Sequence, residues 1–156
     1  MRTIRRMKPE DLIQVCAIEE AIFTEPWSQD SFERALVREQ NLYLVCECGT
    51  RIEGYCGLWG VAGEGQITNV AVKESARRQG IGRLMLLALL EEGRKAGLTA
   101  YTLEVRVSNE AAIRLYHSLG FRDSGIRPDF YELPREDALI MWRMEQDEAG
   151  DQQFPL

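Results

Sequence analysis

The chain has 156 residues, of which 45% are hydrophobic and 28% charged, a composition typical of one globular domain with its own core. Its net charge of −6 argues against a broad basic surface for nucleic acid. No apolar run approaches the roughly 20 residues of a membrane helix, and no apolar segment follows the basic N-terminus, so we expect a cytoplasmic protein that binds neither membranes nor nucleic acid directly.

The hydrophobic periodicity predicts alternating groups of strands and helices. In chain order these are a strand at 2–6, helices at 9–23 and 28–38, strands at 42–48, 52–61 and 66–72, a helix at 80–96, a strand at 101–107, a helix at 109–119, and strands at 121–126 and 138–144. Pro9 suits the first turn of a helix and Ser28 can cap the next one, while Gly97 and Gly120 end the last two.

The order of these elements predicts an α+β fold. Residues 66–107 form a strand–helix–strand unit, which requires one parallel pair of strands, whereas the other connections suit antiparallel hairpins. We therefore expect a single mixed, mostly antiparallel sheet with one parallel β-α-β crossover and helices on both faces. Leu84, Leu87, Ala88 and Leu90 are expected on the apolar side of the helix at 80–96. The domain is expected to span residues 1–145, followed by a polar tail at 146–156.

The cysteines are expected to be free thiols rather than metal ligands or disulfides. They are Cys16, Cys46, Cys48 and Cys56. A zinc site would need tighter pairs or several histidines, and the only histidine is His117. We therefore expect no metal cofactor, and we place His117 on the surface, one position away from the helix face that carries Tyr116.

A glycine-containing segment, Arg77-Arg78-Gln79-Gly80-Ile81-Gly82, connects a predicted strand to a predicted helix. Glycine lets the backbone approach a ligand, and the free N–H groups and dipole of a helix N-terminus favour an anion. Neither the Walker motif nor the dinucleotide-binding motif is present. From these residues alone, the segment either binds phosphate or forms a simple turn before a helix.

A second group of polar residues lies on the strand and helix that follow. Glu104 is on the polar face of a predicted central strand, where a carboxylate is costly unless it is paired or functional. Asn109 and Tyr116 share one side of the next helix, about two turns or ~10.5 Å apart. One interpretation is that these residues line an extended ligand. The alternative is that Glu104 forms an ion pair with Arg106 and that Tyr116 is an ordinary core tyrosine.

The pattern R-x-x-G-x-G formed by Arg77, Gly80 and Gly82 resembles the coenzyme A pyrophosphate loop of the GNAT acetyltransferase family. The run from Leu103 to Phe121, L-E-V-R-x-S-N-x-A-A-I-x-L-Y-x-x-L-G-F, is similar to the RimI-type N-terminal acetyltransferases of that family. The likeness includes Glu25-Pro26-Trp27-Ser28 and the segment 127–138, and it extends over most of residues 3–144.

This resemblance implies the GNAT fold and an acyltransferase that uses acetyl-coenzyme A as co-substrate, with no metal. It implies that backbone N–H groups of residues 77–82 hold the pyrophosphate, and that the strand edge of Val70, Ala71 and Val72 pairs with the pantetheine arm and offers an N–H to the thioester oxygen. Asn109 would bind the same arm. Glu104 would act as general base, directly or through water, and Tyr116 would protonate the leaving thiolate.

The RimI likeness also implies a substrate, the N-terminal alanine of the eighteenth protein of the bacterial small ribosomal subunit, which is a basic protein. Trp27, Tyr131 and Asp137 are candidates for holding that peptide. Two alternatives remain open: an acetyltransferase of small amines with the same fold, and a coenzyme A-binding module without catalysis. The presence of both Glu104 and Tyr116 argues against the second alternative.

Overall fold

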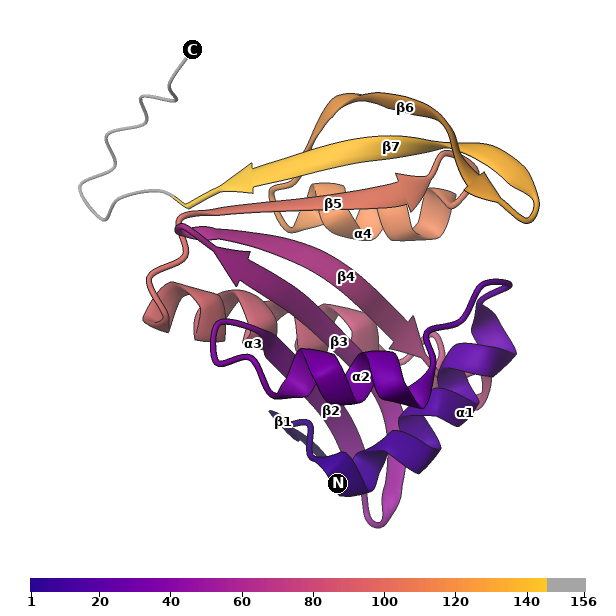
Figure 1. Cartoon of the computed structure of the whole chain (residues 1–156), viewed down its shortest axis with the longest axis vertical. Coiled ribbons are helices and arrows are strands. Elements are labelled where there is room, and N and C mark those ends of the chain that lie inside the picture. Colours follow the sequence, from indigo (N-terminus) through magenta and orange to yellow (C-terminus); the bar gives the residue numbers. More distant parts are fainter. Residues whose placement is uncertain (146–156) are drawn as a thin grey trace.

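A computed structural model describes residues 1–145 as one mixed sheet with helices on both faces, which confirms the predicted fold class (Figure 1). The strands are β1 (Arg2–Arg6), β2 (Leu42–Cys48), β3 (Arg51–Val61), β4 (Glu64–Val72), β5 (Ala100–Arg106), β6 (Arg122–Glu132) and β7 (Arg135–Met144). The helices are α1 (Leu12–Ile22), α2 (Gln29–Leu36), α3 (Ile81–Lys95) and α4 (Glu110–Ser118), with short 3-10 turns at Pro9–Asp11 and Glu74–Ala76. The predicted polar tail at 146–156 lies outside the described residues.

The strand order is β1-β2-β3-β4-β5-β7-β6, and only the β4–β5 pair is parallel within residues 1–145. Buried side chains form one cluster on each face of the sheet. Met85 of α3 and Tyr116 of α4 belong to one cluster, whereas Val15 of α1 and Phe32 of α2 belong to the other. None of the helices in this part of the chain is long and apolar enough to cross a membrane.

The buried side of α3 differs from the prediction. Its buried positions include Met85, Leu86 and Leu89, while Leu84 and Leu87 are 50% and 45% exposed. The prediction was therefore wrong for Leu84 and Leu87, but right for Leu90, which is buried, and for Ala88, which packs against the core. The cause is the nearly continuous apolar run M-L-L-A-L-L, which fits several helical phases equally well.

The strands β4 and β5 separate after a short junction. Only Glu64–Gln66 and Ala100–Thr102 are paired, in three parallel steps. Beyond Gln66 and Thr102 the two ribbons diverge, as Figure 1 shows, although β4 stays paired with β3 and β5 with β7. The facing edges of residues 67–72 and 103–106 therefore have no partner strand in the described part of the chain, and a ligand can use their backbone groups.

A β-bulge in β4 changes which side chains face the α1 side of the sheet. The register against β3 shifts by one residue, so Thr68 is an additional residue in β4. Ile67 and Val70 pack against the α3 cluster, while Asn69 hydrogen-bonds Glu19 of α1 on the opposite face. Without the bulge, alternation from Ile67 would place Asn69 on the α3 face. The bulge therefore points Asn69 toward α1.

The final hairpin is longer than the strands predicted at 121–126 and 138–144. Pro128 interrupted the predicted pattern, but β6 is the last strand of the sheet, and proline is tolerated on edge strands and at bulges. The register of β6 against β7 shifts between Arg127 and Tyr131, so the ribbon stays paired around Pro128. This extension places Arg127 and Tyr131 close to β5.

The cysteines are free thiols, as predicted, and Cys46 and Cys56 are fully buried. His117 lies on the surface, also as predicted, and its ring hydrogen-bonds the Asp123 carboxylate at 2.7 Å.

Candidate active site

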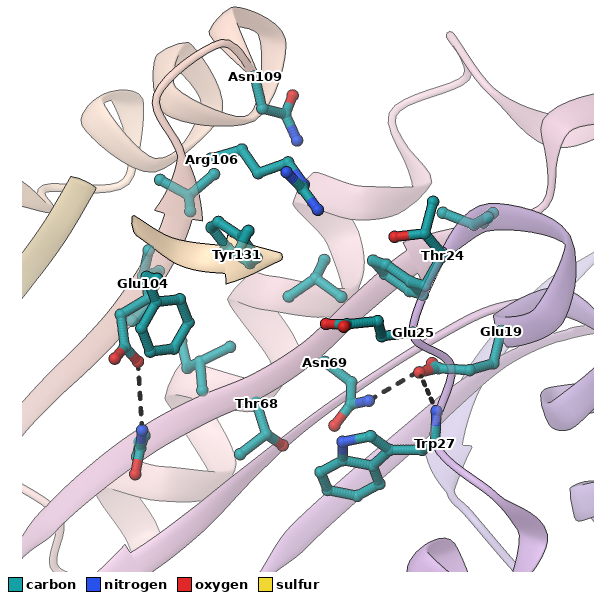
Figure 2. A pocket seen from close by; sticks show the side chains of 18 of the residues that line it. Glu19, Thr24, Glu25, Trp27, Thr68, Asn69, Glu104, Arg106, Asn109 and Tyr131 are labelled. Carbon is teal, nitrogen blue, oxygen red and sulfur yellow. Dashed lines mark hydrogen bonds between the residues drawn. The ribbon is translucent and has the colours of Figure 1, made fainter. Parts of the chain in front are cut away.

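The diverging ends of β4 and β5 open into a cleft of about 580 Å³ (Figure 2). Side chains from α1, α4, the α1–α2 connection and the β6–β7 ribbon complete its walls. The predicted site residues that line it are Trp27, Val70, Glu104, Asn109, Tyr116 and Tyr131. The cleft therefore brings the two predicted catalytic residues together with two of the three predicted peptide contacts.

Glu104 lies on β5 with its side chain 15% exposed. One carboxylate oxygen accepts a hydrogen bond from Gln66 Nε2 at 3.3 Å, and the other pairs with Arg127 Nη1 at 2.9 Å. Because Arg127 is exposed, water screens this ion pair, and its contribution to stability is small. Arg106 pairs with Glu136 instead, so the alternative of a structural Glu104–Arg106 pair is wrong.

Tyr116 lies on α4, buried with its ring 5.7 Å from that of Phe121. Burial raises the pKa of its hydroxyl above the usual value, so the hydroxyl keeps its proton at neutral pH. The hydroxyls of three other buried tyrosines, Tyr43, Tyr55 and Tyr101, each hydrogen-bond a protein group. Within the described residues the Tyr116 hydroxyl has no such partner, which distinguishes Tyr116 from an ordinary core tyrosine.

The loop between β4 and α3 has a backbone that suits an anion. Gly80 directly precedes α3 with a φ of 75°, a conformation that favours glycine, and no side chain caps the helix. The N–H groups of the first turn are therefore open to a ligand. A Cβ at Gly82 would lie 3.5 Å from Leu115 Cδ2 and 3.8 Å from Val72 Cγ2, which are ordinary contacts. Residues 77–82 thus fit a pyrophosphate group beside the end of β4.

Three polar side chains of this loop have different surroundings. Arg77 Nε donates a hydrogen bond to the Val72 carbonyl at 3.2 Å, which ties the loop to the end of β4. The Gln79 amide oxygen accepts a hydrogen bond from the Arg2 guanidinium. Arg78 is exposed and has a φ of 65°, an uncommon conformation for a residue with a side chain. Arg78 is therefore the arginine of the loop whose charge is most accessible to a phosphate.

Asn109 is the N-cap of α4, and its Oδ1 accepts the Ala112 N–H at 3.2 Å. Capping uses one lone pair of this oxygen, and the amide Nδ2 has no hydrogen-bond partner within the described residues. Figure 2 shows Asn109 and Arg106 at the same end of the cleft, above Tyr131.

The three predicted peptide contacts differ in position. Trp27 lies on the cleft wall, its ring 5.9 Å from that of Trp59. Tyr131 lies under the Arg106 guanidinium at 4.2 Å, and burial raises its pKa to about 12. Asp137 does not line the cleft. Its carboxylate instead accepts the backbone N–H of Asp129 in β6 at 2.9 Å.

Sequence reasoning missed a buried polar network on the cleft wall. Glu19 of α1 is only 2% exposed. One of its oxygens accepts the Trp27 N–H at 2.9 Å, and the other accepts the Tyr55 hydroxyl and, at 3.4 Å, the Asn69 Nδ2, as Figure 2 shows for Trp27 and Asn69. Glu19 falls within the apolar stripe of α1, four residues after Val15. That position was a signal in the sequence, because a carboxylate on a buried stripe requires partners.

The cleft is acidic. Among the described residues its lining contains the carboxylates of Glu19, Glu25 and Glu104 against one basic side chain, Arg106. Arg106 pairs with Glu136, and Glu104 pairs with Arg127. An excess of negative charge in a confined space attracts cations. The cleft therefore suits an ammonium group.

Comparison with known proteins agrees with this geometry. The model of the Acetyltransferase (GNAT) family matches residues 12–121. A Bacillus subtilis protein described as a candidate ribosomal protein bS18-alanine N-acetyltransferase is 41% identical over 140 residues, which are 89% of this chain and 93% of that protein. The ribosomal protein bS18-alanine N-acetyltransferase of Escherichia coli strain K12 is 36% identical over 143 residues, 90% of this chain and 96% of that protein.

The solved structures extend the likeness to the whole fold. The crystal structure of the ribosomal-protein-S18-alanine N-acetyltransferase from Escherichia coli has a TM-score of 0.86 and 34% identity, and covers 99% of this chain and 100% of that chain. The GNAT resemblance of residues 77–82 and 103–121 is thereby confirmed. The chain belongs to the GNAT acetyltransferase family and is an acetyl-coenzyme A-dependent N-acetyltransferase.

Proposed function

We propose that this chain acetylates the N-terminal alanine of ribosomal protein bS18, the substrate named for its Bacillus subtilis and Escherichia coli relatives. The observation that carries the proposal is the cleft itself, where Glu104 and Tyr116 line the opening between β4 and β5 among carboxylates that suit an α-ammonium group. We place the reaction in the cytoplasm, where ribosomal proteins are made.

Two parts of the chain bind the co-substrate, which supplies the acetyl group as a thioester. Backbone N–H groups of residues 77–82 hold the pyrophosphate at the N-terminus of α3. The open edge of Val70, Ala71 and Val72 pairs with the amides of the pantetheine arm as an additional strand would, and Asn109 Nδ2 binds the same arm. An N–H of this edge then lies beside the thioester oxygen and stabilises the charge that develops there.

Two side chains manage the protons. An α-amino group has a pKa of about 7.7–8.0, so most of it is protonated at neutral pH and must lose a proton before it attacks. Glu104 accepts this proton, directly or through a water molecule, and releases it to solvent. As a carboxylate again, Glu104 takes the second N–H proton once the amine nitrogen has attacked the thioester carbon. Tyr116 donates a proton to the departing thiolate sulfur. We take the transfer to the amine to be direct; the cleft lining in the described part of the chain contains no cysteine.

The peptide lies between Trp27 and Tyr131, which Figure 2 shows on opposite sides of the cleft. Asp137 contributes indirectly, because its carboxylate binds the backbone of β6 and so maintains the shape of the ribbon that carries Tyr131.

The substrate class can be tested directly. An alanine-initiated, arginine-containing peptide should be acetylated at its α-amine, while free polyamines and aminoglycosides should react little, because the aromatic walls of the cleft suit an extended peptide. Mass spectrometry after incubation with acetyl-coenzyme A, on peptides that differ only at the first residue, measures both the site and the preference. Efficient acetylation of small amines without peptide turnover would favour the small-amine alternative.

The phosphate loop can be tested at Gly82. Gly82→Val should weaken coenzyme A binding by about tenfold or more, because a branched side chain hinders the approach of the backbone to phosphate. The ordinary contacts available to a Cβ there mean that the variant should fold. Gly125→Val is the control, since a Cβ at Gly125 of β6 meets no atom within 4 Å. Calorimetric titration that gives wild-type affinity for a folded Gly82→Val protein would remove the loop from the binding site.

A further inference from the structure

Glu19 determines which way the amide group of Asn69 faces. Both oxygens of the Glu19 carboxylate already accept hydrogen bonds, from the Trp27 N–H and the Tyr55 hydroxyl. The group of Asn69 that faces the carboxylate must therefore be the NH2 donor, at 3.4 Å, because the reverse orientation would set two acceptors against each other. The Asn69 carbonyl oxygen, Oδ1, is held on the opposite side.

This orientation leaves Asn69 Oδ1 buried without a hydrogen-bond partner. Asn69 is only 5% exposed, and within residues 1–145 its Oδ1 is the one side-chain oxygen or nitrogen that is itself fully shielded from solvent and lacks a partner. An unpaired buried acceptor is costly, so such an atom on a cleft wall indicates a ligand. The neighbouring Thr68 hydroxyl has other partners: it donates to the Gly57 carbonyl at 3.5 Å and pairs with the Tyr43 hydroxyl at 2.9 Å.

The bulge in β4 places this acceptor on the reacting side of the sheet. It points Asn69 toward α1, and Glu104 lies on the corresponding face of β5, opposite the core residues Leu103 and Val105. Both side chains line the same cleft, one on each of the two diverging strands. A group that enters between β4 and β5 thus meets a neutral acceptor from one strand and a carboxylate from the other.

We propose that Asn69 Oδ1 accepts a hydrogen bond from the α-amino group of the peptide, and that Glu19 is the positioning residue that directs it; the inference rests on the proposed function. A neutral primary amine has two N–H bonds and one lone pair. If Asn69 and Glu104 each accept one N–H, the lone pair is aimed between the strands, where the thioester lies. An uncharged amide also favours the ammonium form less than a further carboxylate would, which eases the loss of the proton.

The test compares two peptides that differ only in the amine. One begins with alanine, and the other is its desamino analogue, in which hydrogen replaces the α-amino group. Binding is measured with coenzyme A present, so that no turnover occurs. Wild type should bind the alanine peptide at least about tenfold more tightly than the analogue, and Asn69→Ala should lower this ratio by about tenfold. The kcat/KM for the alanine peptide should fall about 10–100-fold with coenzyme A affinity unchanged. Tm should fall modestly, because Glu19 loses the hydrogen bond from Asn69 Nδ2.

Glu19→Gln tests the positioning role. A glutamine amide can donate as well as accept, so it no longer fixes the orientation of Asn69, and part of the preference for the amine should be lost while coenzyme A affinity is kept. Asn41→Ala is the matched control. Asn41 is also buried, and its Nδ2 donates to the Ala35 carbonyl away from the cleft, so its loss should lower Tm and leave the peptide ratio unchanged.

The results distinguish failure of the Asn69 proposal from failure of the proposed function. If wild type acetylates the peptide and Asn69→Ala keeps the full preference for the amine, the role of Asn69 is overturned and the proposed function stands. If wild type acetylates no N-terminal peptide, both are overturned. Should Asn69→Ala fail to fold, Asn69→Ser replaces it with the same expected loss, because the serine hydroxyl is too short to reach the position of Oδ1.

Discussion

Replacing Tyr116 with phenylalanine should lower kcat roughly 10²–10⁴-fold, the usual contribution of a general acid. Coenzyme A affinity and Tm should stay close to wild type, because the ring keeps its packing on Phe121 and the lost hydroxyl has no hydrogen-bond partner within the described residues. Steady-state kinetics, calorimetric titration and thermal unfolding on the one variant separate chemistry from packing.

The pH dependence of kcat gives a second reading of Tyr116. Burial raises its pKa, so the protonated acid persists as pH rises and is lost only above the ordinary tyrosine value of about 10. Wild-type kcat should therefore show no loss from this group between about pH 8 and 9.5. Tyr101→Phe is the control, since it breaks a buried hydrogen bond to the Leu90 carbonyl and should cost about 1–3 kcal/mol of stability without lowering kcat. A fully active Tyr116→Phe enzyme would exclude Tyr116 as the acid.

Glu104→Gln should lower kcat/KM for the peptide by a similar roughly 10²–10⁴-fold, because the amide cannot take the proton of the α-ammonium group. The gap in kcat/KM between Glu104→Gln and wild type should become smaller as pH rises past about 8, since the amine then loses its proton to solvent. Initial rates across this pH range, at fixed saturating acetyl-coenzyme A, measure both effects.

Arg127→Ala distinguishes loss of the base from loss of the ion pair. It removes the partner of Glu104 but leaves the carboxylate in place, and it should retain activity within about tenfold, because an exposed pair contributes little. If Arg127→Ala lowered kcat/KM as much as Glu104→Gln does, the Glu104 carboxylate would act by holding the β6–β7 ribbon through Arg127 and not by accepting a proton.

Local patterns in the sequence predicted most of the fold. The alternation of apolar residues in strands such as β5, and the glycines at helix ends, depend on near neighbours in the chain, so a single sequence contains them. The loop at 77–82, Glu104 and Tyr116 also stand out locally, but their roles come from the GNAT resemblance and stay predictions. Leu84 and Leu87 show the limit of periodicity, because a run of leucines does not define which side of a helix is buried.

The features of the structure that the sequence did not predict depend on contacts between residues far apart in the chain. Glu19 and Asn69 are 50 positions apart, and only the packing of α1 on β4 brings them together. The bulge at Thr68 likewise appears only when β4 is paired with β3, although two adjacent polar residues in an apolar strand hinted at it. Pairing with β7 similarly decides the length of β6, because Pro128 looks like a strand end until the partner strand is known.

Only three paired positions join β4 to β5, so the stability of the fold should depend on the coenzyme A that binds between them. Within the described residues, backbone groups that would hold an ordinary sheet together have no partner strand here. Under the proposed binding mode, the coenzyme pairs with them and contributes to the cohesion of the sheet. A ligand that binds the folded chain alone adds about 2.7 kcal/mol to the free energy of unfolding at a hundredfold excess over its Kd. A cell rich in acetyl-coenzyme A would thus keep the enzyme intact for longer, and starvation would expose it to unfolding and proteolysis.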